Sequence, residues 1–261
     1  MKYDYKITSL ILSLFFIAQF IGLFVISHYL VQDLPYNIQK PEFEPATSYI
    51  PITIMILVAT GIAIILIRFK ASKLWKLWFF IGITFALLIS FSAFIPQVFA
   101  LILALIIAVI KVFKPNYIIH NLGEVFMYGG LAALFVPILS LTSIFILLGI
   151  ISIYDMIAVW KTKHMIKLAK YQSKMRVFAG LLIPYSKDKT AILGGGDIGF
   201  PLFFAGTVLK YSSFLNALIV VIFTTIALGI LLYYAKKNKF YPAMPFLSLG
   251  CLAGYLVTLL I

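Results

Sequence analysis

Residues 7–31 read ITSLILSLFFIAQFIGLFVISHYLV and contain no Lys, Arg, Asp or Glu. A helix needs about 20 consecutive apolar residues to cross the hydrocarbon core of a bilayer, and this run is long enough to do so. It is too long for the apolar region of a cleavable signal peptide, and no small-residue cleavage site follows it. We therefore expect residues 7–31 to form a membrane-spanning helix.

Further apolar runs, bounded by charges or Pro, follow along the whole chain. The run at 118–160 is about twice as long as one crossing needs, so we divide it near Pro137 and Ser143. The fold class predicted is an all-α polytopic membrane protein with nine transmembrane helices, at 7–31, 49–69, 74–93, 95–113, 118–139, 141–161, 191–210, 213–235 and 242–260.

Composition supports a membrane protein and excludes other classes. Of the 261 residues, 63% are hydrophobic and 11% are charged, whereas a soluble domain has about 25% charged residues. A disordered chain needs low hydrophobicity, and a single cysteine cannot form an internal disulfide. A water-soluble domain, a disordered chain and a disulfide-linked framework are therefore excluded.

The distribution of positive charge predicts the orientation. With the N-terminus in the cytoplasm, 19 of the 21 Lys and Arg residues fall in cytoplasmic segments, and only Lys40 and Lys210 do not. Cytoplasmic loops of membrane proteins carry this excess. We expect a multi-pass protein of the cell membrane with a cytoplasmic N-terminus and an exterior C-terminus. The net charge of +13 then reflects topology and contact with the lipid bilayer, not nucleic-acid binding.

Three regions follow from this topology. Residues 1–161 form an N-terminal six-helix half, 162–190 a cytoplasmic loop, and 191–261 a C-terminal three-helix part. Within the loop, the apolar stretch Met175–Tyr185 is too short to span the membrane. It can be an apolar patch at the membrane interface or a strand that pairs with an unwound substrate.

Two acids lie well inside apolar runs: Asp155 in the sixth predicted helix and Asp197 in the seventh. Glu124 is nearer the cytoplasmic start of a helix, where we expect its carboxylate to reach lipid headgroups. Asp155 lies six residues before Lys161, and Asp197 six residues after Ala191, so both should lie about 9 Å below the cytoplasmic boundary. Ionised groups inside the membrane are costly and usually functional. At equal depth on neighbouring helices, the two carboxyls can meet and share one proton.

Two further segments belong near this pair. Gly194, Gly195 and Gly196 precede Asp197 directly, and consecutive glycines permit close backbone approach or simply close helix packing. The segment Pro242-Ala243-Met244-Pro245 lies at the cytoplasmic start of the ninth helix, where it can initiate that helix or keep the backbone extended.

These residues resemble the motifs of the presenilin and signal peptide peptidase superfamily of GxGD intramembrane aspartyl proteases. Tyr154-Asp155 matches YD, Gly194 to Asp197 matches GxGD, and Pro242-Ala243-Met244 matches PAL with Met in place of Leu. The number of spans and their orientation resemble presenilin, and the short loops resemble a compact archaeal homologue. The resemblance implies that Asp155 and Asp197 are catalytic, and that Tyr154, Gly194, Gly196, Pro242, Ala243 and Met244 support the site or bind substrate.

The expected function is hydrolysis of peptide bonds within transmembrane helices of single-span membrane proteins by an aspartic endopeptidase. One Asp would activate a water, and the other would polarise the scissile carbonyl. No metal or organic cofactor is needed, accessory subunits are not expected to be required, and a homo-oligomer is possible. The alternative is a cation or proton channel or transporter that uses the same two carboxylates.

Other residues of chemical interest have simpler explanations. We expect Cys251 to pack in the last helix, and Gly250 and Gly254 to form a small-residue face for helix packing. The three His residues share no spacing typical of a metal site.

Overall fold

The computed structural model describes residues 4–69, 71–162, 178–186, 189–236 and 240–261. Most of the expected loop at 162–190, including Met175 and Asp188, therefore lies outside the described residues.

Nine α-helices lie in the described part of the chain, close to the positions predicted from hydropathy. Their bounds are α1 Tyr5–Val31, α2 Tyr49–Arg68, α3 Ser72–Ser92, α4 Gln97–Phe113, α5 Tyr117–Phe135, α6 Leu141–Met156, α8 Gly195–Tyr211, α9 Phe214–Tyr234 and α10 Met244–Thr258.

The division of the apolar stretch at 118–160 is confirmed. A 3-10 turn at Val136–Ile138 follows α5, and the Ser140 hydroxyl accepts a hydrogen bond from the Ser143 N–H at 3.0 Å to cap α6. Pro137 lies in that turn, where its missing N–H leaves no helix bond unmade.

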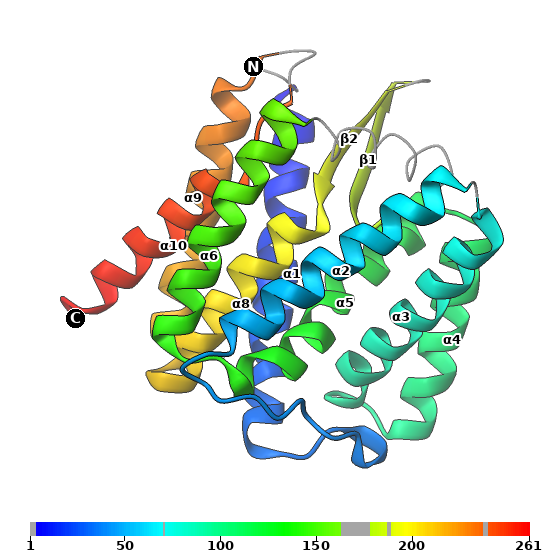
Figure 1. Ribbon diagram of the computed structural model, residues 1–261, viewed down its shortest axis with the longest axis horizontal. Helices are drawn as coiled ribbons and strands as arrows, with labels where there is room; N and C mark the ends of the chain where they lie inside the picture. The colour runs from blue at the N-terminus through cyan, green and yellow to red at the C-terminus, as the bar shows by residue number, and fades with distance from the viewer. Residues whose placement is uncertain (1–3, 70, 163–177, 187–188, 237–239) are drawn as a thin grey trace.

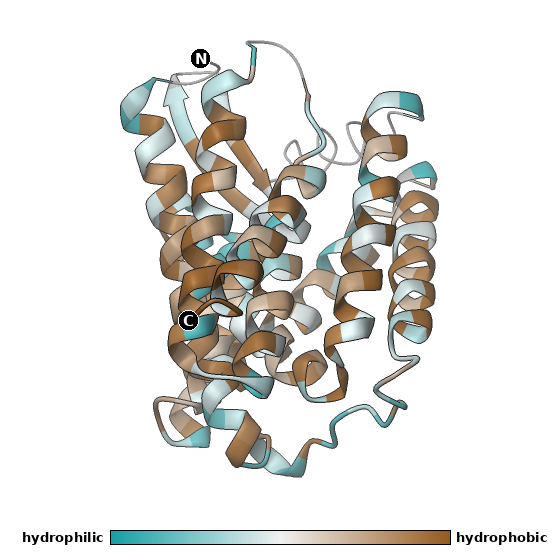
Figure 2. Cartoon of the chain, turned by 90° about the vertical axis from the view of Figure 1, so that its left-hand side faces the viewer, coloured by the Kyte–Doolittle hydropathy of each residue, from teal (hydrophilic) through white to brown (hydrophobic). Residues whose placement is uncertain are grey.

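Hydrophobic residues predominate along the helices of the bundle, as the hydropathy colouring in Figure 2 shows. Six described helices are long and apolar enough to cross a membrane, and α4 and α10 are shorter apolar helices. α2 is the least buried of the six, and residues such as Ile54, Leu57 and Val58 on it are exposed. Such a surface is suited to lipid, so the chain is a multi-pass membrane protein. The full count of nine spans and the orientation of the termini stay predictions.

Helix α1 packs against α5, α8 and α9 in the middle of the bundle (Figure 1). Glycines allow the closest crossings. A Cβ on Gly129 would lie 3.2 Å from the Cα of Gly22, and one on Gly130 would collide with the carbonyl of Ala86. Tight packing through small residues is the main attraction between helices in lipid.

Close packing at glycines also joins α10 to α9, which is the role predicted for Gly250 and Gly254. A Cβ on Gly250 would lie 2.7 Å from that of Ala227, and one on Gly254 would lie 2.7 Å from the Cα of Val220. Cys251 is fully buried beside Thr224, with 3.4 Å between its sulfur and the threonine hydroxyl, which is the packing role expected for it.

In the part of the chain that the structure describes, one antiparallel hairpin adds to the helices. β1 (Gly180–Ser186) pairs with β2 (Lys189–Gly194), with Gly180 opposite Gly194 and Leu182 opposite Ile192. The described part of the Met175–Tyr185 stretch thus forms a strand. The predicted helix start at residue 191 is wrong, because the backbone of 189–194 is paired with β1, and the helix begins only at Gly195.

Candidate active site

Asp155 is the penultimate residue of α6, which continues as a π-helical turn from Ile157 to Lys161. Its Oδ2 accepts a hydrogen bond from the backbone N–H of Met244 at 3.2 Å. Pro242 and Ala243 are buried just before α10, and Ala243 is the N-cap residue whose carbonyl accepts from the Leu247 N–H at 3.1 Å. The chain therefore reaches the carboxylate at the first turn of α10. Asp155 itself and the preceding Tyr154 are partly exposed.

Asp197 is the third residue of α8, directly after β2 ends. Its carboxyl lies against the backbone of Gly194, where a Cβ would be 3.2 Å from Oδ2. Asp155 is near enough for its charge to act on Asp197. The helix ends that carry these residues lie on the same side of the bundle as the hairpin (Figure 1).

The structure therefore brings three of the sequence motifs together from α6, α8 and α10. The predicted reason for the proximity of the two acids, their equal depth on neighbouring helices, is partly wrong, however. The predicted depth of Asp197 was based on six helical residues between Ala191 and Asp197. Residues 191–194 are instead an extended strand, which rises about 3.3 Å per residue in place of 1.5 Å.

The three glycines before Asp197 have different surroundings. Gly194 borders the carboxyl of Asp197, as described above. A Cβ on Gly196 would meet only the ring of Phe200, at 3.5 Å, which is an ordinary contact. A Cβ on Gly195 would lie 2.5 Å from the Tyr128 hydroxyl and 3.2 Å from the Ala179 carbonyl oxygen. The position that excludes a side chain most strictly is thus Gly195, which the predicted site did not include.

A buried polar cluster on α4 and α5 was also missed. Glu124 is fully buried and forms an ion pair with Lys111, which is 1% exposed. The expectation that Glu124 reaches lipid headgroups is therefore wrong. The same carboxylate accepts hydrogen bonds from the Tyr128 hydroxyl and, at 2.7 Å, from the Gly180 N–H. The available signal was the four-residue spacing of Glu124 and Tyr128, which places both on one helix face.

Gln19 of α1 is a second residue that sequence reasoning did not select. Its side chain is fully buried, and its Nε2 donates to the carbonyl of Ile198 at 2.7 Å, next to Asp197. The signal was an amide side chain within an otherwise apolar span, because such groups hydrogen-bond across helices in membranes.

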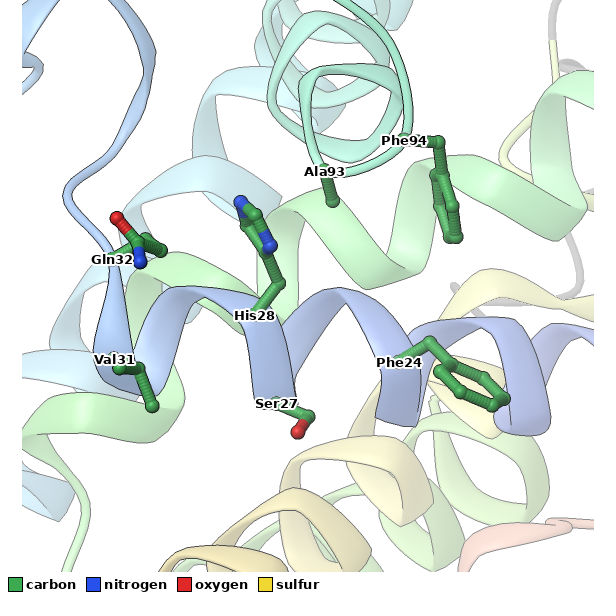
Figure 3. Close-up of a pocket in the computed structure, with 7 residues that line it drawn as sticks. All are labelled: Phe24, Ser27, His28, Val31, Gln32, Ala93 and Phe94. Carbon is green, nitrogen blue, oxygen red and sulfur yellow. The ribbon is translucent and has the colours of Figure 1, made fainter.

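A separate pocket lies farther along α1, between its last turns and the end of α3 (Figure 3). It is lined by Phe24, Ser27, His28, Val31, Gln32, Ala93 and Phe94, and contains none of the predicted site residues. Among the described residues, no group of three or more His, Cys, Asp or Glu is placed to hold a metal ion.

Comparison with known proteins agrees with this geometry. Residues 12–197 match the family model described as signal-peptide peptidase, presenilin aspartyl protease. No curated protein sequence matches the chain. The matched range ends at Asp197 and does not include Met244, whose N–H contacts Asp155 in the structure.

Two solved structures share the fold, both titled as a presenilin family intramembrane aspartate protease. One, in space group C222, has 19% identity and a TM-score of 0.67, over 95% of this chain and 94% of that chain. The other, in space group P2, has 20% identity and a TM-score of 0.67, over 96% of this chain and 97% of that chain. Because the family model covers most of the sequence, the chain belongs to the signal-peptide peptidase and presenilin family of aspartyl proteases.

Proposed function

We propose that the protein hydrolyses peptide bonds within the transmembrane helices of single-span membrane proteins, with Asp155 and Asp197 as the catalytic pair. The observation that carries this proposal is the convergence of Asp155, Asp197 and the Met244 N–H from three helices. Two nearby carboxyls that share a proton can act as base and acid towards a water and a carbonyl.

In this mechanism, the ionised member of the pair removes a proton from a water held between the carboxyls. The neutral member donates a hydrogen bond to the scissile carbonyl, and the water oxygen attacks the carbonyl carbon. The C–N bond of the resulting tetrahedral intermediate then breaks, as the carboxyl that took the water proton transfers it to the departing amine nitrogen. The chemistry needs no group beyond the two carboxyls and the water.

The hairpin supports a mode of substrate binding. Side chains of α5 occupy one edge of β1: Asn121 exchanges two hydrogen bonds with Leu182, at 2.8 and 2.9 Å, and His120 donates to the Gly180 carbonyl at 2.8 Å. The N–H and C=O groups of Gly180 and Leu182 thus point away from β2. In an antiparallel ladder, the opposite residues Gly194 and Ile192 then point away from β1.

The outer edge of β2 therefore presents the backbone of Ile192, and no third strand pairs with it in the described residues. β2 leads directly into the first turn of α8, which contains Asp197. An unwound substrate segment can add to this edge as a strand, which would place an extended peptide beside the acids. A helix must unwind before its backbone can reach catalytic groups, so this pairing stabilises the form that is cleaved.

The alternative function, an ion channel or transporter, also uses intramembrane carboxylates. It gives no role to the Met244 contact or to the hairpin edge.

The decisive experiment incubates the purified protein in detergent with a labelled single-span protein and follows the products on a gel. Cleavage by the wild type and none by Asp197→Ala is expected. The same preparations are placed in liposomes for ion-flux measurements. Flux that depends on Asp197, without any cleavage, would support the channel and overturn the protease proposal.

Strand addition has its own test. Ile192→Pro deletes the N–H that points away from β1, at an edge position where proline is tolerated. Ile192→Val keeps that N–H and removes only one methylene group, so it is the matched control. We expect a higher KM for the proline variant alone. Equal KM values for both variants would contradict pairing at this edge.

A further inference from the structure

The buried cluster of Lys111, Glu124 and Tyr128 lies outside the catalytic pair, yet it contacts both segments that lead to Asp197. The ion pair of Lys111 with Glu124 links α4 to α5. The Glu124 carboxylate accepts one hydrogen bond from the N–H of Gly180, the first residue of β1, and another from the hydroxyl of Tyr128, one turn later on α5. We refer to Lys111, Glu124 and Tyr128 as the brace.

The first contact of the brace fixes the hairpin. Gly180 has a φ of 134°, and a Cβ there would lie 2.1 Å from the carbonyl oxygen of Leu193. Only glycine adopts this backbone readily, and its N–H is satisfied by the Glu124 carboxylate at 2.7 Å. The neighbouring Ala179 carbonyl accepts from the Gly195 N–H at 3.0 Å. The position of Gly180 therefore determines where α8 begins.

The second contact of the brace acts on α8 directly. The Tyr128 hydroxyl fills the space where Gly195 lacks a side chain, and the Tyr128 ring borders Gly199 one turn later. Tyr128 is 3% exposed and lies near enough to Asp197 for electrostatic interaction. The segment that leads into Asp197 is thus contacted from two directions, by the chain at Ala179 and Gly180 and by Tyr128. Gly180 and Tyr128 both donate hydrogen bonds to the buried Glu124 carboxylate.

We propose that the brace is a positioning device for Asp197: Glu124, oriented by Lys111, sets the place of Gly180 and Tyr128, and these two set the start of α8. This inference rests on the proposed protease function. A buried ion pair is a poor source of stability, because the cost of burying two charges offsets much of their attraction. The role we assign to this ion pair is therefore the geometry that it imposes.

The sharpest variant is Tyr128→Phe, which removes one hydroxyl and leaves the ring. Tyr29→Phe is the matched control, because Tyr29 is 2% exposed and its hydroxyl also makes one buried hydrogen bond, to the Ile89 carbonyl at 2.9 Å. A purely structural role predicts equal effects. We expect kcat to fall about tenfold for Tyr128→Phe with KM within about twofold, and both constants to stay within about twofold for Tyr29→Phe.

Removing Glu124 alone would leave Lys111 as an uncompensated buried charge and could prevent folding. Two double variants avoid this. Lys111→Met with Glu124→Gln keeps an oxygen that can accept from Gly180 and Tyr128, whereas Lys111→Met with Glu124→Leu does not. We expect the first to keep at least about a third of the wild-type kcat and the second to lose about tenfold or more.

Hydrogen exchange of the peptides that cover 178–197 gives a readout that does not depend on cleavage. We expect faster exchange there in Tyr128→Phe and in the Leu double variant, but not in Tyr29→Phe or the Gln double variant. Equal exchange and equal kcat in Tyr128→Phe and wild type, or equal losses in the two double variants, would overturn the brace. If the wild type cleaves no single-span substrate, the proposed function fails, and the exchange data alone decide the brace.

Discussion

Substitution of Gly195 by Ala tests the site with a single added methyl group. Gly195 begins α8, and a Cβ there would lie 2.5 Å from the Tyr128 hydroxyl. Ordinary contact begins near 3.4 Å, so about 0.9 Å of separation has to be created. The hydroxyl cannot move freely, because it is buried and hydrogen-bonded to Glu124.

Two responses are open to the protein, and both have a cost. If Tyr128 moves, its hydrogen bond to a charged carboxylate is lost, at about 1.5–3 kcal/mol. If the start of α8 moves, overpacking costs about 1–3 kcal/mol, and a shift of about 1 Å near catalytic groups can lower the rate by about 100-fold. We therefore expect Gly195→Ala to lower the free energy of unfolding by about 1–3 kcal/mol and kcat by about 10- to 100-fold.

The assay combines thermal unfolding in detergent with initial rates on a fluorogenic single-span substrate. Gly149→Ala is the control, because Gly149 lies within α6 and a Cβ there meets nothing within 4 Å. It should keep full activity and equal or higher stability, since alanine is the better helix former.

A double-mutant cycle identifies the cause. In a Tyr128→Phe background the clashing oxygen is absent, so Gly195→Ala should cost less stability than in the wild type, although the 3.2 Å approach to the Ala179 carbonyl remains. Additive effects in the cycle, or a Gly195→Ala protein as stable and active as Gly149→Ala, would refute the assigned geometry.

Three further predictions concern the proposed catalytic pair and its cleavage site. Asp155→Ala and Asp197→Ala should each abolish cleavage, the double variant should lose no more, and thermal stability should hold or rise because like-charge repulsion is removed; near-native turnover in either single variant would contradict the pair. The rate between about pH 4 and pH 9, with folding checked at each pH, should be bell-shaped because one shared proton is required; a steady rise to pH 9 would not fit. Mass spectrometry should locate the cuts near the cytoplasmic end of the substrate helix, and cuts confined to its outer half would contradict the expected topology.

Much of the fold could be predicted because its signals are local. A membrane helix satisfies its own backbone hydrogen bonds, so a long apolar run such as residues 7–31 is sufficient to predict one. For the same reason, an acid within such a run is conspicuous, so the sequence alone indicates Asp155 and Asp197 as candidate site residues. The order of the three motifs along the chain also indicates Met244 as a candidate, and its N–H contacts Asp155 in the structure.

Tertiary structure decided the features that depend on a partner elsewhere in the chain. Residues 191–194 are as apolar as a helix start, and only pairing with β1 makes them a strand. Glu124 near a helix start is compatible with headgroups or with burial, and Lys111 on another helix decides between them. Gly195 must lack a side chain because Tyr128 occupies that space. The sequence determined which segments form long apolar helices, because apolar length is a property of each segment. The packing of those segments decided how Asp197 is held, because each contact needs two surfaces that only the fold brings together.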